Sequence, residues 1–309
     1  MSPAADEQSA ASPASRARNR SPARRRRTAR RRRTARVFGL GALYVILLGY
    51  AAVVILPMIW LLYTSLKSNR EIFAGAWDLP HALHWENFVY AWVRAGIGRY
   101  FLNSVFVTVV SVALILIVSA MAAYALTRFT FRGNRLIFYA FLVGLMIPTQ
   151  LALVPLFFLI NSLRLLDTYT GLILVYVAFS LPFTIFVLAA FFRTLPHELA
   201  EAALIDGCTH SQAFWRVMLP LAKPGLVTAA IFNFLGIWNE YLFALVFISS
   251  EKLRTLPLGL ANLLIVSHYE SDWGALFAGL VMVMIPTLLA YSLLQGQLTK
   301  GITVGALKG

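Results

Sequence analysis

Long apolar runs separated by short polar breaks dominate the pattern along the chain. A helix that crosses about 30 Å of hydrocarbon needs roughly 20 mostly apolar residues, and six runs approach or exceed that length. They cover residues 38–65, 103–126, 136–160, 170–192, 225–249 and 274–296. The pattern therefore predicts an all-α, polytopic membrane protein with six transmembrane helices.

The composition agrees with this class and argues against a typical soluble enzyme. Of the 309 residues, 59% are hydrophobic and 13% are charged, whereas an ordinary soluble domain is about 45–50% apolar and about 25% charged. The single cysteine, Cys208, excludes an intrachain disulfide and a cysteine-rich metal site. His81 and His84 are two ligands without a third, so we expect no metal site.

The excess positive charge lies mostly in an N-terminal tail. Residues 1–36 hold twelve arginines against Asp6 and Glu7, which accounts for most of the formal net charge of +14. The tail is rich in Ala, Ser, Pro and Arg, so we expect it to be disordered, with a transmembrane permease domain over 37–309. It is either a nucleic-acid arm or a topogenic flank that attracts lipid. The apolar run that follows directly favours lipid over specific nucleic acid.

The distribution of basic residues predicts the orientation. Arg128, Arg132 and Arg135 crowd the short connection 127–135, whereas the connection 161–169 on the opposite side holds only Arg164. By the positive-inside rule, both termini are expected to face the cytoplasm. The long connection 193–224 then lies on the cytoplasmic side.

Capping signals predict a helix-turn-helix over 193–224. Thr194 is positioned to cap a first helix, and Gly207 follows at the place where a left-handed residue would end it. Thr209 with Gln212 three residues later forms a capping box for a second helix. These signals depend on neighbours in the sequence and need no tertiary contact.

The two predicted helices differ in what they present. Pro220 and Pro224 are expected to stop the second helix. The first carries Glu198 near its positive end, and Ala202 and Ala203 make it slim. A slim, partly apolar helix displayed outside the bilayer suits a groove on another protein.

The same loop carries a specific family resemblance. Glu201-Ala202-Ala203, three residues, Gly207, nine residues and then Val217-Met218-Leu219-Pro220 resemble the EAA-x3-G-x9-I-x-LP signature of bacterial ABC importer permeases. Val217 stands where the signature usually has Ile. Other segments resemble the carbohydrate branch of that family: Phe192–Pro196, Ile205–Gly207, Asn103-Ser104, Met146-Ile147-Pro148, Trp238-Asn239-Glu240, Thr255-Leu256-Pro257 and, like the tail of maltose-permease G-type subunits, Lys300–Gly309.

The resemblance covers about residues 38–309. It implies a six-helix subunit of the type I, maltose-permease-like fold in a bacterial cytoplasmic membrane, paired with a second permease. It further implies ATP-driven import of a sugar or oligosaccharide delivered by an extracytoplasmic binding protein. The subunit itself is then not an enzyme and binds no cofactor, because ATP and Mg are bound by a separate cytoplasmic ATPase dimer.

In that family the EAA loop is the element that docks on the ATPase. Carried over by position, the ATPase-coupling residues are Glu198, Glu201, Ala202, Ala203, Asp206, Gly207, Leu219 and Pro220. Cys208 stands where the family commonly has a small residue, and we expect it to be a buried small side chain rather than a reactive thiol.

Four polar residues within the apolar runs have two interpretations. They are Gln150, Asn233, Asn239 and Glu240. A charged carboxylate within a membrane costs about 2.5–3.5 kcal/mol on insertion scales, so Glu240 in particular needs partners. These side chains either line the path of the sugar or form polar contacts between helices, and the second role is the more common one.

Rival functions leave the EAA loop unexplained. A secondary transporter would carry ionisable residues in several spans, yet Glu240 is the one clear case. An ATPase within this chain is excluded, because a phosphate-binding loop needs a lysine where the chain has Ile302.

Five prolines lie within or beside the predicted spans and act either as hinges or as static kinks. They are Pro57, Pro148, Pro155, Pro182 and Pro286.

Overall fold

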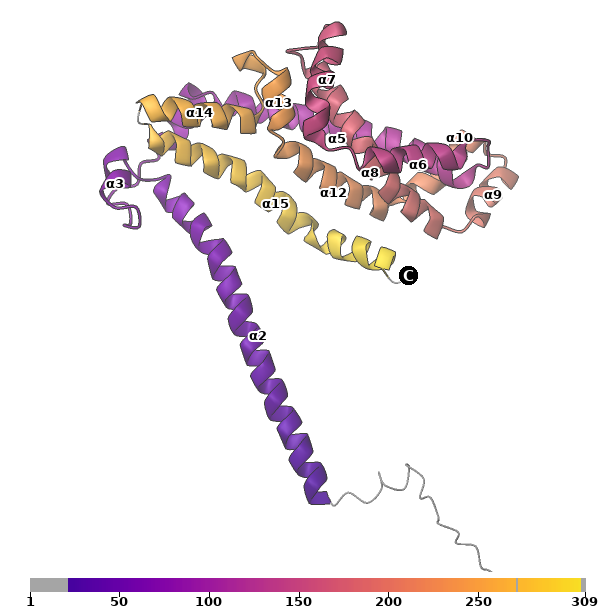
Figure 1. Ribbon diagram of the computed structural model, residues 1–309, viewed down its shortest axis with the longest axis horizontal. Coiled ribbons are helices and arrows are strands. Elements are labelled where there is room, and N and C mark those ends of the chain that lie inside the picture. Colours follow the sequence, from indigo (N-terminus) through magenta and orange to yellow (C-terminus); the bar gives the residue numbers. More distant parts are fainter. Residues whose placement is uncertain (1–21, 271, 307–309) are drawn as a thin grey trace, which may run out of the picture. The chain divides into compact units, whose positions relative to one another are not determined.

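The computed structural model describes the backbone of residues 22–270 and 272–306 and the side chains of residues 40–41, 43–265 and 272–292. Helices account for nearly all of the regular structure, and the described residues contain no strand (Figure 1). The longer helices are α2 (Pro22–Thr64), α5 (Ile97–Arg128), α6 (Asn134–Gly144), α7 (Thr149–Ser162), α8 (Tyr169–Thr194), α12 (Lys223–Trp238), α14 (Leu256–Glu270) and α15 (Trp273–Ala306).

Short helical segments connect these helices. They are α3 (Asn69–Ala74), α4 (Glu86–Val89), the π-helix η1 (Tyr90–Arg94), α9 (Glu198–Ile205), α10 (His210–Ala213), the π-helix η2 (Phe214–Met218), α11 (Leu219–Leu221), α13 (Leu242–Phe247) and the 3-10 turn η3 (Glu251–Leu253). Figure 1 shows α9 and α10 at one end of the bundle formed by α5, α8 and α12, with α14 at the other end.

The helices agree with a polytopic membrane protein. Within the described residues, four stretches are long and apolar enough to cross a membrane, namely 43–64, 97–128, 169–194 and 273–292. Two bent pairs, α6 with α7 and the segment His210–Leu221 with α12, pass the same test together. Counting each pair as one span gives the six that the apolar runs predict.

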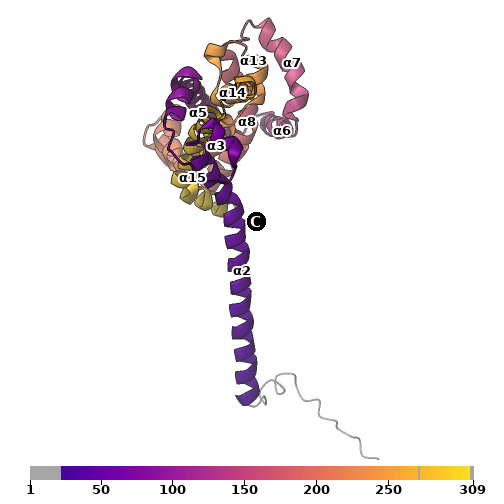
Figure 2. The same ribbon diagram turned by 90° about the vertical axis from the view of Figure 1, so that its left-hand side faces the viewer.

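Helix α5 is the centre of the packing. Three hydrophobic clusters of buried residues lie along it, and it contributes side chains to each. Ile97 and Tyr100 belong to the first, Val107 and Ile115 to the second, and Tyr124 with its neighbours to the third. In the turned view (Figure 2), α6 and α7 lie on the side of α8 away from α15.

The third predicted span is not one continuous helix. Residues 136–160 divide into α6 and α7, which meet at an angle of 104°. Pro148 is the N-cap of α7 with a ψ angle of 127°. A proline also disfavours helical backbone at the residue before it, so the helix ends and restarts with a new direction. The break expected at Pro148 is therefore present, and it divides the predicted span into two helices.

The fifth predicted span begins after a bend and ends early. The segment His210–Leu221 ends between Pro220 and Pro224, so the expected stop of this helix is confirmed. Pro224 is tolerated in the first turn of α12 because the first N–H groups of a helix have no intrahelical partner. The chain bends by 74° between the two segments, and α12 ends at Trp238 before α13 begins.

Two further elements differ from the apolar pattern. Helix α2 begins at Pro22 and so includes residues 22–36, which composition led us to expect as disordered. Arginine and alanine are good helix formers and extend the apolar helix. Residues 1–21 lie outside the described residues.

Helix α14 was not predicted, because its apolar stretch 256–265 is too short to span a membrane.

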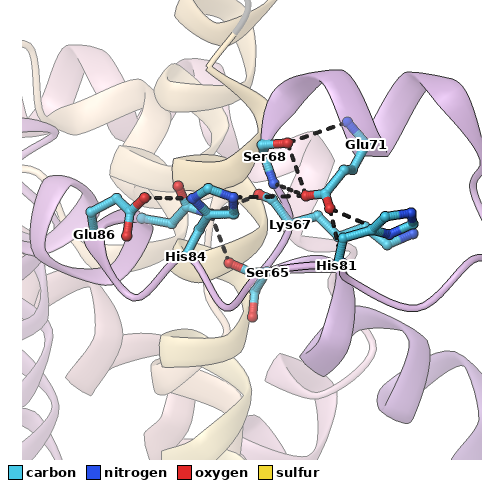
Figure 3. Close-up of polar contacts among 8 residues, drawn as sticks. Ser65, Lys67, Ser68, Glu71, His81, His84 and Glu86 are labelled. Atoms are coloured by element: carbon cyan, nitrogen blue, oxygen red, sulfur yellow. Dashed lines mark hydrogen bonds and ion pairs between the residues drawn. The ribbon is translucent and has the colours of Figure 1, made fainter.

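A polar cluster occupies the segment between α2 and α5 (Figure 3). The Glu71 carboxylate accepts hydrogen bonds from the N–H and hydroxyl of Ser68, both at 2.8 Å, and from the N–H of His81 at 2.9 Å. These donors, the Ser68 N–H first, lower the pKa of Glu71 from 4.5 to about 2. His84 Nδ1 lies 2.5 Å from Glu86 Oε1.

No group of three metal-ligating side chains comes together in the described part of the chain.

Candidate functional site

The loop 193–224 folds as two short helical arms joined at a left-handed glycine. Gly207 has a φ angle of +87°. The N–H of Cys208 donates to the carbonyl of Ala203 at 2.9 Å, and the N–H of Gly207 donates to that of Leu204 at 3.1 Å. This pair of bonds is the Schellman motif that ends a helix at glycine, so the predicted end of the first arm is confirmed.

The start of the first arm differs from the prediction. Thr194 is the last residue of α8, and its hydroxyl donates to the carbonyl of Phe191 at 2.7 Å. Helix α9 starts at Glu198 with His197 as its N-cap and without a side-chain cap. The expected cap at Thr194 is therefore wrong, because α8 extends through the threonine instead of ending before it.

The second arm starts as predicted. The Thr209 hydroxyl accepts from the N–H of Gln212 at 3.2 Å, and the Gln212 side chain accepts from the N–H of Thr209 at 2.8 Å. This is a complete capping box for α10. The arm then passes into η2, which buries Phe214 and Met218 against the bundle.

Helix α9 has a buried face and an exposed face. Ala203 is buried and faces the bundle. Glu198, Glu201 and Ala202 are exposed, and Ile205 is 86% exposed although it is a large apolar side chain. Sequence reasoning placed Ala203 on the coupling surface and missed Ile205, because the spacing of residues does not show which face of a short helix packs inward.

The remaining predicted loop residues divide in the same way. Asp206, Gly207 and Pro220 are exposed. Leu219 packs against the cluster that joins α5, α8, η2 and α12. Cys208 is partly buried rather than fully buried. The loop thus exposes its acidic side chains together with the apolar Ile205, while Leu219 packs against the bundle and Ala203 is buried.

The end of α5 contacts the start of the loop and its second arm. Arg128 Nη2 donates to the carbonyl oxygens of Phe192 at 2.9 Å and Leu195 at 2.8 Å. One turn earlier, the Tyr124 ring lies 5.7 Å from the ring of Phe192 and 5.1 Å from that of Phe214, measured between centroids. The loop is therefore fixed to α5 as well as to the helices that carry it.

Two of the polar residues in the spans bind within the chain. Asn233 is buried, and its Nδ2 donates to the Thr184 hydroxyl of α8 at 2.9 Å. Glu240 accepts from the Tyr176 hydroxyl at 2.7 Å and from the N–H of Phe243 at 2.7 Å. Both side chains join helices of this chain, which is the second of the two roles expected for them.

The other two are exposed. Gln150 is the second residue of α7 and faces outward. Asn239 is exposed as well, although its Nδ2 donates to the carbonyl of Leu235 at 2.9 Å. It lies with Tyr241 in the wall of a cavity of about 340 Å³ that α14 and α15 also line. Leucine, proline and valine side chains line the rest of this cavity, so its few polar groups come from Asn239 and Tyr241.

Comparison with known proteins places this chain among transport proteins. The model of the family described as "Binding-protein-dependent transport system inner membrane component" matches residues 115–304. The diacetylchitobiose uptake system permease protein NgcG of Streptomyces coelicolor is 45% identical over 265 residues, covering 86% of this chain and 88% of that protein. The trehalose transport system permease protein SugB of Mycobacterium tuberculosis is 36% identical, covering 85% of this chain and 95% of that protein.

A solved structure has the same fold. It is the crystal structure of a bacterial ABC transporter involved in the import of the acidic polysaccharide alginate. The likeness has a TM-score of 0.76 at 25% sequence identity and covers 85% of this chain and 97% of the matched chain. The fold of this chain is thus one that occurs in a bacterial ABC transporter involved in import.

Proposed function

Because this chain belongs to the family of binding-protein-dependent transport system inner membrane components, we propose that it drives sugar import by docking its 193–224 loop on a separate ATPase. The chain is a permease subunit of an ABC importer of the carbohydrate type and is not an enzyme. The observation that carries the docking proposal is the exposed face of α9, where Ile205 stands 86% exposed among acidic side chains.

The exposed face of α9 has the properties of a docking element. An isolated monomer would leave the large apolar surface of Ile205 in water, whereas burial against a partner is favourable by about 25 cal/mol per Å². Glu198, Glu201 and Asp206 around it favour a groove with an apolar floor and a basic rim. The Schellman motif at Gly207 holds the helix in one conformation before docking, which lowers the entropic cost of binding.

The remaining partners follow from the same assignment. The complex consists of this subunit, a second permease, an ATPase dimer that binds ATP and Mg, and an extracytoplasmic sugar-binding protein. The arginines of 127–135 and of the N-terminal tail favour an orientation with both termini and the α9 loop in the cytoplasm of a bacterium. The tail arginines then face anionic lipid headgroups rather than a specific nucleic acid.

The substrate we propose is a di- or oligosaccharide. The named relatives import diacetylchitobiose and trehalose. Asn239 is a better candidate for contact with the sugar than Asn233 or Glu240, because its side chain is exposed beside Tyr241. We expect Asn239→Ala to raise the apparent KM for uptake at unchanged abundance, and Asn233→Ala to lower abundance instead. An unchanged KM for Asn239→Ala would remove this residue from the path.

The docking proposal is tested by substituting lysine for exposed residues of α9. Ile205→Lys and Glu201→Lys should each reduce the amount of ATPase that purifies with the permease pair, by about tenfold for a loss of about 1.4 kcal/mol. Sugar uptake and sugar-stimulated ATP hydrolysis should fall together. The matched control is Thr130→Lys, which adds the same charge to an exposed position at the same end of the bundle but outside α9.

Equal membrane abundance of all variants, checked by immunoblot, keeps the comparison valid. If both α9 variants retain the ATPase at the level of Thr130→Lys, and hydrolysis still responds to loaded binding protein, the loop is not the coupling element.

A further inference from the structure

Arg128 stands apart from the other arginines of its connection. Arg132 and Arg135 are exposed, and a solvated arginine suffices to bias topology. Arg128 is partly buried, and its Nη2 binds the carbonyl oxygens of Phe192 and Leu195, which lie 64 and 67 residues away in the sequence. A topological role alone requires neither the burial nor the bonds.

The two carbonyls mark the point where α8 becomes the loop. Phe192 lies in the last turn of α8, and Leu195 is the residue after its end. Carbonyl groups in the last turn of a helix lack intrahelical partners and form the negative end of its dipole, so a guanidinium is a favourable cap there. The guanidinium of Arg128 therefore acts on the end of α8 and on the connection that leads to α9.

The second arm of the loop is held by the turn of α5 before Arg128 and by the residue after it. Tyr124 packs against Phe214 of η2 as well as against Phe192. Just beyond Arg128, the Phe129 ring lies 5.3 Å from the ring of His210 in α10. The end of α5 thus touches the end of α8, the connection that leads to α9 and the second arm, although none of these adjoins it in the sequence.

We propose that Arg128 is a positioning residue that locks the 193–224 loop to α5, so that movement of the docked loop is passed to the centre of the membrane bundle. This inference rests on the proposed docking of the loop on an ATPase. It adds the route: α5 contributes to all three hydrophobic clusters, so a displacement of its end acts on every layer of the bundle. Without the lock, the loop moves with α8 and η2 while α5 lags behind.

The experiment uses the complete transporter in proteoliposomes with loaded binding protein. Arg128→Gln removes the charge and shortens the side chain, whereas Arg128→Lys keeps the charge and a long side chain whose ammonium can donate to both carbonyls. Arg132→Gln is the matched control, because it removes the same charge from the same connection at an exposed position. For each variant, sugar uptake, ATP hydrolysis and ATPase retention are measured.

We expect Arg128→Gln to retain the ATPase but to lower the number of sugars imported per ATP hydrolysed by about fivefold or more. Arg128→Lys should recover most of that ratio, and Arg132→Gln should match the wild type. A merely structural role would lower abundance and ATPase retention and leave the ratio of the remaining complexes unchanged. That result, or a normal ratio for Arg128→Gln, overturns the inference.

Failure of this inference is distinguishable from failure of the docking proposal. If Ile205→Lys loses the ATPase while Arg128→Gln keeps a normal ratio, docking stands and the lock is refuted. If Ile205→Lys also keeps the ATPase, the docking proposal itself fails. Should Arg128→Gln prove poorly abundant, Arg128→Lys still decides, because a ratio no better than that of the residual Arg128→Gln complexes contradicts the role of the two carbonyl bonds.

Discussion

The two ends of the bundle are held together by different kinds of contact. At the α9 end, which comprises loop 193–224 and the last turn of α5, bonds within the loop are local caps. Arg128 supplies the hydrogen bonds from a distant helix to its backbone. At the Asp167 end, which comprises loops 163–168 and 248–256 and the first turns of α5, several side chains bind backbone across long sequence separations.

Asn103 illustrates the second kind. Its Nδ2 donates to the carbonyls of Lys252 and Arg254, both at 2.9 Å, and its Oδ1 accepts from the Tyr169 hydroxyl at 2.7 Å. The Asp167 carboxylate accepts from the N–H groups of Ser249 and Ser250 and from the Ser250 hydroxyl. These bonds lower the pKa of Asp167, the Ser250 hydroxyl contributing most.

The difference indicates that one end of the bundle is rigid while the other end exposes a helix to a partner. Many long-range bonds make the Asp167 end resistant to local opening, since the two loops are bonded to each other and one of them is bonded to α5. The α9 end instead presents a preformed helix next to an arm that packs through apolar side chains. A loop that passes on the movement of a partner benefits from this arrangement, because apolar contacts are non-directional, whereas Arg128 holds its start by directed bonds.

The largest expected effect comes from Gly207→Val at the α9 end. Valine at a φ of +87° costs about 1–3 kcal/mol of backbone strain, and no atom lies within 4 Å of the new Cβ, so the strain alone reorients the arms. ATPase retention should fall by about tenfold or more. Gly207→Asn, which tolerates left-handed backbone, is the control and should retain most of the ATPase. Equal retention by both variants would contradict a preformed α9.

Asn103→Ala tests the Asp167 end with an intermediate effect. It leaves the carbonyls of Lys252 and Arg254 and the Tyr169 hydroxyl without their present partner, which costs about 1–3 kcal/mol of stability. We expect a lower Tm for the purified permease pair and an unchanged ratio of sugar imported per ATP. A normal Tm together with a changed number of sugars imported per ATP would contradict the proposal that the Asp167 end contributes stability and the α9 end contributes coupling.

The smallest expected effect is the pH response of Glu71. Its pKa is lowered from 4.5 to about 2, so the native state favours the carboxylate. The resulting stabilisation is fully present above the unfolded value and is lost as the pH falls from about 4.5 towards about 2. The Tm difference between the wild type and Glu71→Gln should be constant above about pH 5 and shrink below pH 4.5. Both proteins carry His81→Gln and His84→Gln, which remove the two histidines that lie 3.7 and 3.8 Å from the Glu71 carboxylate. A difference that shrinks already near pH 6 contradicts the assignment.

Much of the fold follows from the chain order of its residues. The apolar runs determine which segments form membrane helices, because a spanning helix needs an unbroken apolar length. The end of α9 at Gly207 and the capping box of Thr209 with Gln212 are also fixed by sequence, because their bonds join residues within five positions of one another. Such signals remain readable without any knowledge of packing.

Tertiary structure decided which side chains are exposed to a partner and which are bound within the chain. The sequence shows Ala203 and Ile205 as two apolar residues of one short helix, and only packing against η2 buries the first and leaves the second exposed. Likewise, the sequence does not distinguish the three arginines of one short connection, Arg128, Arg132 and Arg135, since each carries the same charge. The carbonyls that distinguish Arg128 come from residues 64 and 67 positions away, and a contact across that distance exists only after the helices have packed.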